Sequence, residues 1–284
     1  MSREVWFHLH VPKCAGSTVE QHVAAHLGGE AFLRPTRRHG IGYYFGRGYD
    51  IPVQRELSEI RFVSGHFFGR SVEQLFSSAE IRRTVLLRDP LSYTLSLYNY
   101  RMRRYQKQGA RVVPFDVWRR SRGADPISTF ILNRYLEIPL WRLLMLDRAA
   151  KAELLGRALE GFDFVGDISS CCDFVAQLSQ RMGIPRVNAR RNVTPTDERL
   201  IHADNLSASV LAEIRASTAL DQWLWESYRE RGWERWGRSE VPKFSGDGAS
   251  SLIGELRRGL YSVVARSIRG RLSGRPSLEE IERR

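Results

Sequence analysis

Val11-Pro12-Lys13-Cys14-Ala15-Gly16-Ser17-Thr18 is the stretch that decides the fold. It follows a short apolar run at residues 5–9 and precedes a helix-like segment at residues 19–25. A strand, a loop of small residues and a helix start are typical of a site for phosphate or a similar anion. The reason is that the first N–H groups of a helix are unpaired and its dipole favours negative charge there. Lys13 adds a full positive charge. An ordinary strand-to-helix turn with an exposed Lys is the alternative.

This loop differs from the two best-known phosphate-binding loops. In a Walker A loop, G-x-x-x-x-G-K-[ST], the Lys follows the glycines. Here Lys13 precedes the only glycine, Gly16, by three residues. The sequence also lacks the dinucleotide-binding pattern G-x-G-x-x-G. The loop therefore indicates an anion site of another kind.

Short apolar runs, bounded by turn residues or helical patterns, predict buried strands. They occupy residues 5–9, 60–64, 84–87 and 162–166. Amphipathic patterns predict helices at 171–182, 207–216 and 220–231, and Pro90 begins another helix with Asp89 as N-cap. This alternation predicts an α/β fold of three layers, in which helices flank a central parallel sheet. Residues 29–59 predict a loop that borders a binding site, or else a hairpin, and residues 106–126 predict a polar, Arg-rich connection.

Length and composition limit the class of protein. The chain has 284 residues, of which 42% are hydrophobic, enough for one large domain. The N-terminal apolar run is too short for a secretory signal, and no stretch approaches the roughly 18 apolar residues of a membrane span. The three cysteines form neither a disulfide framework nor a zinc pattern. We therefore expect a reducing, cytoplasmic setting. Cys14 either has a lowered thiol pKa or fills space in the loop, and the lack of a neighbouring base favours the second.

The formal net charge of +12 favours anionic partners such as acidic polysaccharide, an anionic membrane face or a phosphorylated cofactor. A solvated basic surface explains much of the same charge. Nucleic acid is not expected, because the sequence has no aromatic-plus-basic RNA motif, zinc finger or basic zipper.

Composition divides the chain into three parts. We expect a globular domain over residues 1–238, a linker rich in Gly and Ser over 239–251, and a basic helical tail over 252–284. Residues 252–272 have the pattern of an amphipathic helix with several Arg. Such a helix lies on an anionic membrane surface, packs on the domain or pairs with a second subunit in a homo-oligomer.

Two further motifs follow predicted strands. Arg88-Asp89-Pro90, with Ser96 two turns into the next helix, suits a terminal phosphate, because a guanidinium fork binds two oxygens together. His66 follows the second long apolar run, where open α/β sheets place their ligands. A neutral imidazole there can take a proton from a hydroxyl, although a structural His bonded to a backbone carbonyl is the alternative.

These motifs together resemble those of a known enzyme family. Pro12-Lys13-x-x-Gly16-Ser17-Thr18 is similar to the 5′-phosphosulfate loop of sulfotransferases that use 3′-phosphoadenylyl sulfate (PAPS), in particular the Golgi-type carbohydrate enzymes and their bacterial relatives. Arg88-Asp89-Pro90 with Ser96 resembles their 3′-phosphate motif, although Tyr93 and Thr94 stand where many relatives have an Arg. Gly65-His66 resembles the catalytic-base position of uronyl 2-O-sulfotransferase-like enzymes. The resemblance covers roughly residues 4–235, including segments 164–167, 192–194 and 220–228. Residues 190–194 either close over the nucleotide or form an ordinary basic loop.

The resemblance implies a P-loop-like fold and sulfuryl transfer from PAPS to a carbohydrate hydroxyl. Residues 12–18 would hold the 5′-phosphosulfate, with Lys13 neutralising the bridging oxygen, and Arg88 and Ser96 would hold the 3′-phosphate. His66 would act as general base, and no metal would be needed. The acceptor would be a capsule, polysaccharide or glycolipid precursor in the bacterial cytoplasm, at the inner membrane face. Two alternatives remain: a small-molecule kinase using Ser17 and Asp89 with magnesium, and a non-catalytic binder of anionic glycans or membranes.

Overall fold

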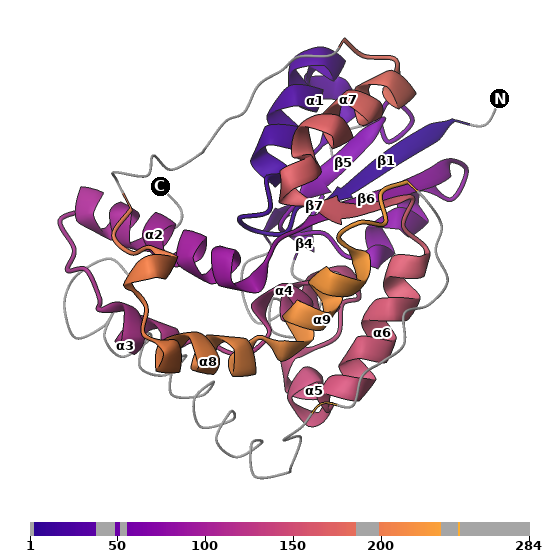
Figure 1. The fold of residues 1–284 in the computed structure, drawn as a ribbon. Coiled ribbons are helices and arrows are strands. Elements are labelled where there is room, and N and C mark those ends of the chain that lie inside the picture. Colours follow the sequence, from indigo (N-terminus) through magenta and orange to yellow (C-terminus); the bar gives the residue numbers. More distant parts are fainter. Residues whose placement is uncertain (1–2, 38–48, 52–55, 186–198, 234–243, 245–284) are drawn as a thin grey trace.

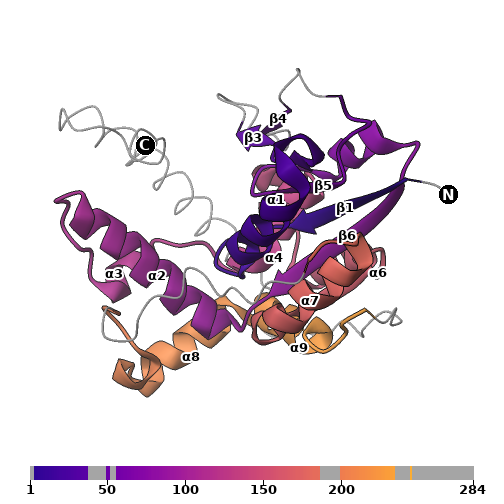
Figure 2. The same ribbon diagram turned by 90° about the horizontal axis from the view of Figure 1, so that it is seen from above.

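A central parallel sheet with helices on both faces forms the frame of the molecule (Figures 1 and 2). The computed structural model describes residues 3–37, 49–51, 56–185, 199–233 and 244. The sheet has the strand order β2-β5-β1-β6-β7, and every neighbouring pair is parallel. Its strands are β1 (Glu4–Leu9), β2 (Phe32–Leu33), β5 (Phe62–Gly65), β6 (Glu80–Leu87) and β7 (Phe164–Asp167).

Alternation along the strands divides the core in two, because successive side chains of a strand point to opposite faces. On one face, Phe7 and Leu9 of β1 join a large core with α6 (Arg148–Glu160), α9 (Ala219–Tyr228) and η2 (Arg70–Phe76). On the other face, Trp6 of β1 joins a smaller core with α1 (Gly16–Ala31) and α7 (Cys171–Met182). Figure 1 shows α1 and α7 together on that face. The predicted three-layer α/β architecture is therefore confirmed.

The path of the chain reverses its direction at the centre of the sheet. From β1 the chain passes through α1 to β2, which lies beyond β5 on one side. From β6 it passes through several helices, including α6 on the opposite face, to β7 on the other side. The reversal lies between the adjacent strands β1 and β6. In open α/β sheets, ligands bind outside the carboxyl ends of the strands at such a switch point.

A second group of helices projects from the carboxyl side of the sheet. The long helix α2 (Pro90–Lys107) follows β6, and α3 (Phe115–Arg120) and α8 (Ala208–Ser217) lie near it in both views (Figures 1 and 2). Shorter elements lie along the chain between the longer helices and strands. They are α4 (Pro126–Phe130), the π-helix η3 (Ile131–Tyr135), α5 (Leu140–Met145) and the 3₁₀ turns η4 (Ile168–Ser170) and η6 (Ala203–Asn205).

The four predicted strands and the predicted helices are present, with shifted ends. The second strand begins at Phe62 rather than at residue 60, and the fourth ends at Asp167. Helix α9 ends at Tyr228, three residues earlier than expected. Between residues 29 and 59, β3 (Thr36–Arg37) and β4 (Tyr49–Asp50) pair antiparallel, which agrees with the hairpin alternative. The polar, Arg-rich connection predicted over 106–126 contains a short helix, α3, that the sequence did not indicate.

Several expectations concern residues outside the described part of the chain. They are the loop at 190–194, almost all of the linker at 239–251 and the basic helix at 252–272. Phe244, within the expected linker, is described and packs against the larger core. No helix in the described ranges is both long and apolar enough to span a membrane.

Candidate functional site

The loop after β1 and the turn after β6 meet at the switch point. Lys13 lies four residues beyond the end of β1, and Arg88 directly follows β6. The Nη1 of Arg88 donates a hydrogen bond to the backbone carbonyl of Lys13 at 3.0 Å. The two sequence motifs predicted to bind anions are therefore joined directly. This bond fixes the guanidinium beside the first turn of α1.

The backbone of the loop has an unusual conformation that leaves its amides available. Lys13 and Ala15 have φ values of 63° and 62°, and Cys14 between them has negative φ. Alternation of this kind turns successive N–H groups towards one concave side, as in anion-binding nests. The amides of Lys13, Ala15, Gly16 and Ser17 have no hydrogen-bond acceptor among the residues that the structure describes. Helix α1 also has no side-chain cap and no acidic residue in its first turn. These amides form a cradle for an anion.

Two partly buried cations border this cradle. Burial lowers the pKa of Lys13, and the neighbouring charge of Arg88 lowers it further. Burial likewise lowers the pKa of Arg88, although Cys14, Asp89 and Asp167 oppose this. In the described part of the chain neither cation forms an ion pair with a carboxylate, and the buried Nε of Arg88 has no hydrogen-bond partner. Uncompensated charge of this kind attracts an anion.

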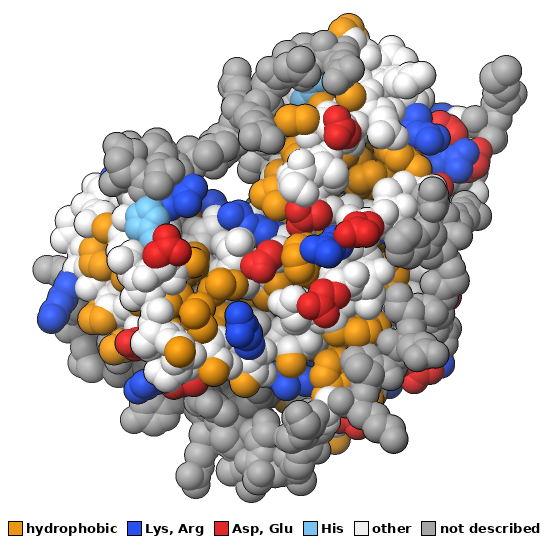
Figure 3. Space-filling model, in the orientation of Figure 1, with side chains coloured by type: hydrophobic (Ala, Val, Ile, Leu, Met, Phe, Trp, Pro, Cys, Tyr) orange, Lys and Arg blue, Asp and Glu red, His pale blue; other side chains and the backbone are white. Residues whose placement is uncertain are grey.

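The Lys13 ammonium also contacts α2. Its Nζ lies 4.3 Å from the ring centroid of Tyr100, an exposed side chain of that helix. This contact places the anion cradle opposite α2. Figure 3 shows a hollow between the α2 side of the molecule and the sheet side, and Lys and Arg side chains gather on its α2 rim. The hollow gives solvent access to this edge of the sheet.

His66 stands beside the loop, directly after β5. Its Nδ1 donates to the backbone carbonyl of His10 at 2.8 Å, which leaves Nε2 as the unprotonated nitrogen of the neutral ring. Burial, and secondly the charge of His10, lower the pKa of His66 to about 4. The rings of Phe67 and Phe130 contact its edges. At pH 7 His66 is therefore neutral, and its Nε2 can accept a proton.

His10 is the site residue whose role the sequence did not indicate. Its Nδ1 lies 2.8 Å from Oε1 of Glu20, and its ring lies 4.0 Å from that of His66, centroid to centroid. A Cβ on Gly16 would fall 2.0 Å from Cδ2 of His10. The imidazole therefore fills the space that Gly16 leaves empty. The one available signal was its position beyond β1, on the same face as His8.

The remaining predicted site residues occupy varied positions. Cys14 is buried in the larger core, and burial raises the pKa of its thiol, so that it fills space rather than reacts. Pro12 in the loop and Ser17 in the first turn of α1 are half-buried, and the amide of Thr18 donates to the carbonyl of Ala15. Ser96 is half-buried on α2, and no hydrogen bond in the described ranges joins it to Arg88. The structure thus joins Lys13 to Arg88, and Gly16 to His66 through His10, whereas no contact between Ser96 and Arg88 is found among the described residues.

His8, although close in sequence, is a core residue. It is fully buried, stacks on Phe62 and Phe174, and its Nδ1 lies 3.0 Å from Oγ1 of Thr84. Burial lowers its pKa to about 3. It is neutral at pH 7 and is separated from solvent, so it plays no part in the site.

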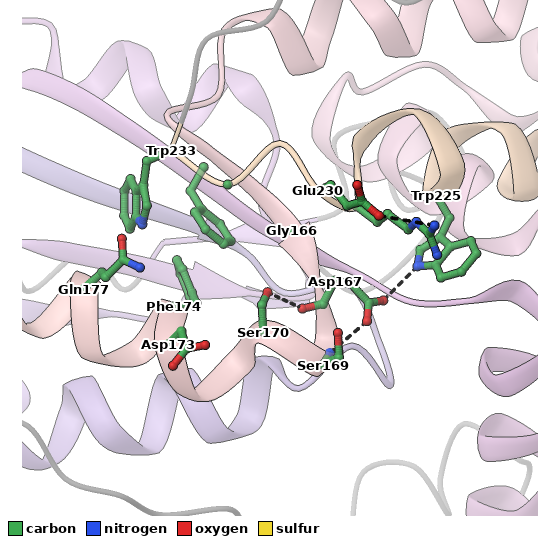
Figure 4. A pocket seen from close by; sticks show the side chains of 13 residues that line it. Gly166, Asp167, Ser169, Ser170, Asp173, Phe174, Gln177, Trp225, Glu230 and Trp233 are labelled. Carbon is green, nitrogen blue, oxygen red and sulfur yellow. Dashed lines mark hydrogen bonds and ion pairs between the residues drawn. The ribbon is translucent and has the colours of Figure 1, made fainter.

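A pocket of about 450 Å³ opens beside β7, next to the switch point (Figure 4). Aromatic side chains of Phe174, Trp225 and Trp233 line it, together with the carboxylates of Asp167 and Asp173. The indole N–H of Trp225 donates to Asp167 at 2.8 Å. Three acidic residues, Asp167, Asp173 and Glu230, line this space with one cation, Arg229. It therefore suits a phosphate group less well than the cradle at Lys13 and Arg88 does.

Comparison with known proteins finds no family model that matches the sequence, and no characterised protein with significant similarity to it. The function must therefore be argued from the geometry of the site.

Proposed function

We propose that this protein is a PAPS-dependent sulfotransferase that sulfates a hydroxyl group of a carbohydrate, and that its fold is P-loop-like. The observation that carries the proposal is the hydrogen bond between Arg88 and the Lys13 carbonyl. This bond joins the Lys13 loop and the Arg88 turn at the switch point of the sheet. The first resembles the 5′-phosphosulfate loop of PAPS-dependent sulfotransferases, and the second resembles their 3′-phosphate motif. The unbonded amides and the buried Nε of Arg88 supply the donors that such a doubly anionic ligand needs.

The cradle and the two cations would share the binding of the donor. The amides of residues 13 and 15–17 bind the oxygens of the sulfated 5′ end, and Lys13 moves from Tyr100 to neutralise the bridging oxygen. Arg88, with Ser96 from α2, binds the 3′-phosphate, the group that distinguishes PAPS from ATP. Bound PAPS supplies an activated sulfuryl group. The protein contributes positioning and charge stabilisation, as in phosphoryl transfer.

His66 would accept the proton of the acceptor hydroxyl at Nε2. As the acceptor oxygen forms its bond to sulfur, the bond from sulfur to the bridging oxygen breaks and 3′-phosphoadenosine 5′-phosphate (PAP) leaves with the electron pair. A pKa of about 4 makes His66 a weak base in the free protein. A bound anion nearby stabilises the imidazolium and raises that pKa towards neutrality, where a general base is most effective.

The first experiment compares ligands for the cradle. We expect PAP to raise the thermal midpoint of unfolding more than ATP with magnesium does, and Lys13→Ala or Arg88→Ala to reduce the effect of PAP. A larger shift with ATP and magnesium would overturn the proposal in favour of a kinase.

The second experiment tests the base. Labelled PAPS is incubated with unsulfated heparosan, chondroitin and dextran, and transfer to each polysaccharide is measured. We expect His66→Ala to lose about 10²- to 10⁴-fold in transfer rate, the usual contribution of a general base, while its PAP affinity stays close to that of the wild type. Full transfer activity in His66→Ala would remove His66 from the mechanism.

A further inference from the structure

Glu20 is a buried carboxylate, one turn into α1, that binds to three other parts of the sheet edge. Its Oε1 accepts hydrogen bonds from Nδ1 of His10 at 2.8 Å and from Oγ of Ser64 in β5 at 3.0 Å. Its Oε2 accepts from Nη2 of Arg34, just after β2, at 2.5 Å. Glu20 thus connects α1 to three neighbouring strands: to β5 itself and to the residues just after β1 and β2.

Glu20 is fully ionised at neutral pH. Burial alone favours its protonated form, but the hydrogen bond and charge of His10, together with Arg34 and Ser64, outweigh burial and lower the pKa of Glu20 to about 2. An ionised carboxylate can only accept, so Nδ1 of His10 carries a proton and donates it to Glu20. The Nε2 of His10 has no hydrogen-bond partner in the described part of the chain.

Through His10, Glu20 is connected to both halves of the site. The backbone carbonyl of His10 accepts the Nδ1 proton of His66, and the His10 ring packs 4.0 Å from the His66 ring. The same ring lies against Gly16, the first residue of α1. A rotation of His10 would therefore disturb the base on one side and the amide cradle on the other.

A purely stabilising role accounts poorly for this arrangement. Buried ion pairs contribute little net stability, because the loss of hydration offsets the attraction between the charges. Apolar side chains at these positions would hold α1 to the sheet at least as well. What a carboxylate adds is a fixed tautomer and a fixed orientation for the imidazole that it binds, as in the Asp-His pair of hydrolases.

We propose that Glu20 and His10 form a positioning unit that aligns His66 with the amide cradle. Glu20 acts through His10, and neither residue needs to touch the acceptor. As a role in catalysis, the inference rests on the proposed function. As a statement about the two imidazoles, it can be tested without any nucleotide.

The test compares Glu20→Gln with Glu73→Gln. Glu73 is a matched control: it is similarly buried and also binds an Arg, Arg83, but it lies in η2, away from the site. Long-range ¹H–¹⁵N spectra of the imidazoles at pH 7 report the tautomer of each His. In the wild type we expect His10 and His66 to be protonated at Nδ1. In Glu20→Gln we expect His10 to become a mixture of tautomers and the His66 signals to shift, whereas Glu73→Gln leaves both unchanged.

Transfer from PAPS gives the second readout. We expect Glu20→Gln to lower kcat at least about tenfold, up to the 10²- to 10⁴-fold of a general base, with a smaller change in KM for PAPS. Glu20→Asp, which retains the charge, restores part of the rate. If Glu20→Gln does not fold, Arg34→Gln replaces it, because the Arg34 side chain is 56% exposed and we expect the fold to tolerate its loss. That variant should change the same imidazole signals to a smaller extent.

The outcomes separate the two proposals. If the imidazole spectra of Glu20→Gln, or of Arg34→Gln in its place, match the wild type, the positioning unit is wrong whatever the enzyme does. If the spectra change but kcat does not, the unit has no catalytic role. If the wild type binds no PAP and transfers no sulfuryl group, the proposed function fails, and with it the catalytic role. The spectra then decide only whether Glu20 orients His10.

Discussion

The absence of a side chain at Gly16 has a steric cause. Gly16 is not among the residues with positive φ, so its backbone does not require glycine. The His10 ring, held by Glu20, occupies the place of a Cβ. Lys13 and Ala15 adopt the left-handed conformation without being glycine. The loop therefore stores backbone strain at the two residues that flank Cys14, as functional loops often do.

Gly16→Ala should destabilise the protein through this clash. We expect the free energy of unfolding to fall by about 1–3 kcal/mol, as for other overpacked sites, because either His10 or the start of α1 must move. Urea denaturation measures the change. Gly29→Ala, beyond the kink that Gly28 makes near the end of α1, is the control, because no atom of a neighbouring segment lies within 4 Å of the added Cβ. Equal stability of the two variants would show that His10 does not fix this position.

Individual site residues differed in how well the sequence predicted them. Arg88 and His66 directly follow β6 and β5, Lys13 lies four residues beyond β1, and the carboxyl ends of parallel strands meet at one edge. Glu20 has no such signal, since it looks like an ordinary acidic residue of an amphipathic helix. Its importance depends on Arg34 and Ser64, which pairing of β2 and β5 brings to it. Contacts between distant segments of this kind leave no local pattern.

Helix α2 begins as its sequence predicts. Asp89 is the N-cap and its Oδ1 accepts from the amide of Ser92 at 3.0 Å, with Pro90 as the first helical residue. This cap fixes the turn that carries Arg88. A kinase would instead need Asp89 as a ligand of magnesium, and the two roles predict different responses to mutation.

Substitution of Asp89 distinguishes these roles. We expect the free energy of unfolding of Asp89→Asn to stay within a few tenths of a kcal/mol of the wild-type value, because Asn caps a helix as well as Asp does. For Asp89→Ala we expect it to fall by about 1 kcal/mol. PAP binding should persist in Asp89→Asn. If Asp89→Asn instead abolished magnesium-dependent ATP binding, Asp89 would be a metal ligand and the kinase alternative would gain support. Thermal-shift titrations with both nucleotides make the comparison.

The sequence patterns missed the 13-residue helix α6 and several much shorter elements. Strand β2 has two residues, too few to show alternation, and exists because Phe32 and Leu33 pair with Phe62 and Val63. Helix α4 has only five residues, and its start is bound by a residue distant in the sequence. Asp221 of α9 accepts hydrogen bonds from the amides of Ile127 and Ser128. Such elements depend on tertiary contacts, so local propensity cannot predict them.

At the scale of the whole molecule, the pH dependence of stability comes from titratable side chains that are buried in their neutral form. His66 has a pKa of about 4 in the folded protein and an ordinary value of 6.5 when unfolded. Between these values the unfolded chain binds more protons, so stability falls as the pH is lowered from about 6.5 to 4. The charged or titratable groups near His66 are His10, Glu20 and Arg34. Asp221, whose pKa burial raises to about 7, acts in the opposite direction, so a comparison with a variant is needed.

His66→Gln isolates the contribution of His66. Replacing it removes the acid-sensitive group but leaves Asp221 and the other histidines in place. We expect the stability of the wild type relative to His66→Gln to decrease by about 2 kcal/mol between pH 7 and pH 5. Urea denaturation of both proteins at the two pH values measures it. A difference that stays constant would mean that His66 is solvated and titrates as in the unfolded chain.

The contact between His10 and Gly16 also has an evolutionary consequence. In many loops a glycine is fixed by its own backbone, and its replacement is harmful whatever surrounds it. Here the constraint comes from a ring six residues earlier in the chain. Chains related to this one should therefore vary at the two positions together: where position 10 has a small side chain, position 16 is free to become alanine or serine. The tolerance of this loop to mutation is thus a property of a residue pair, and a scan of single substitutions would not detect it.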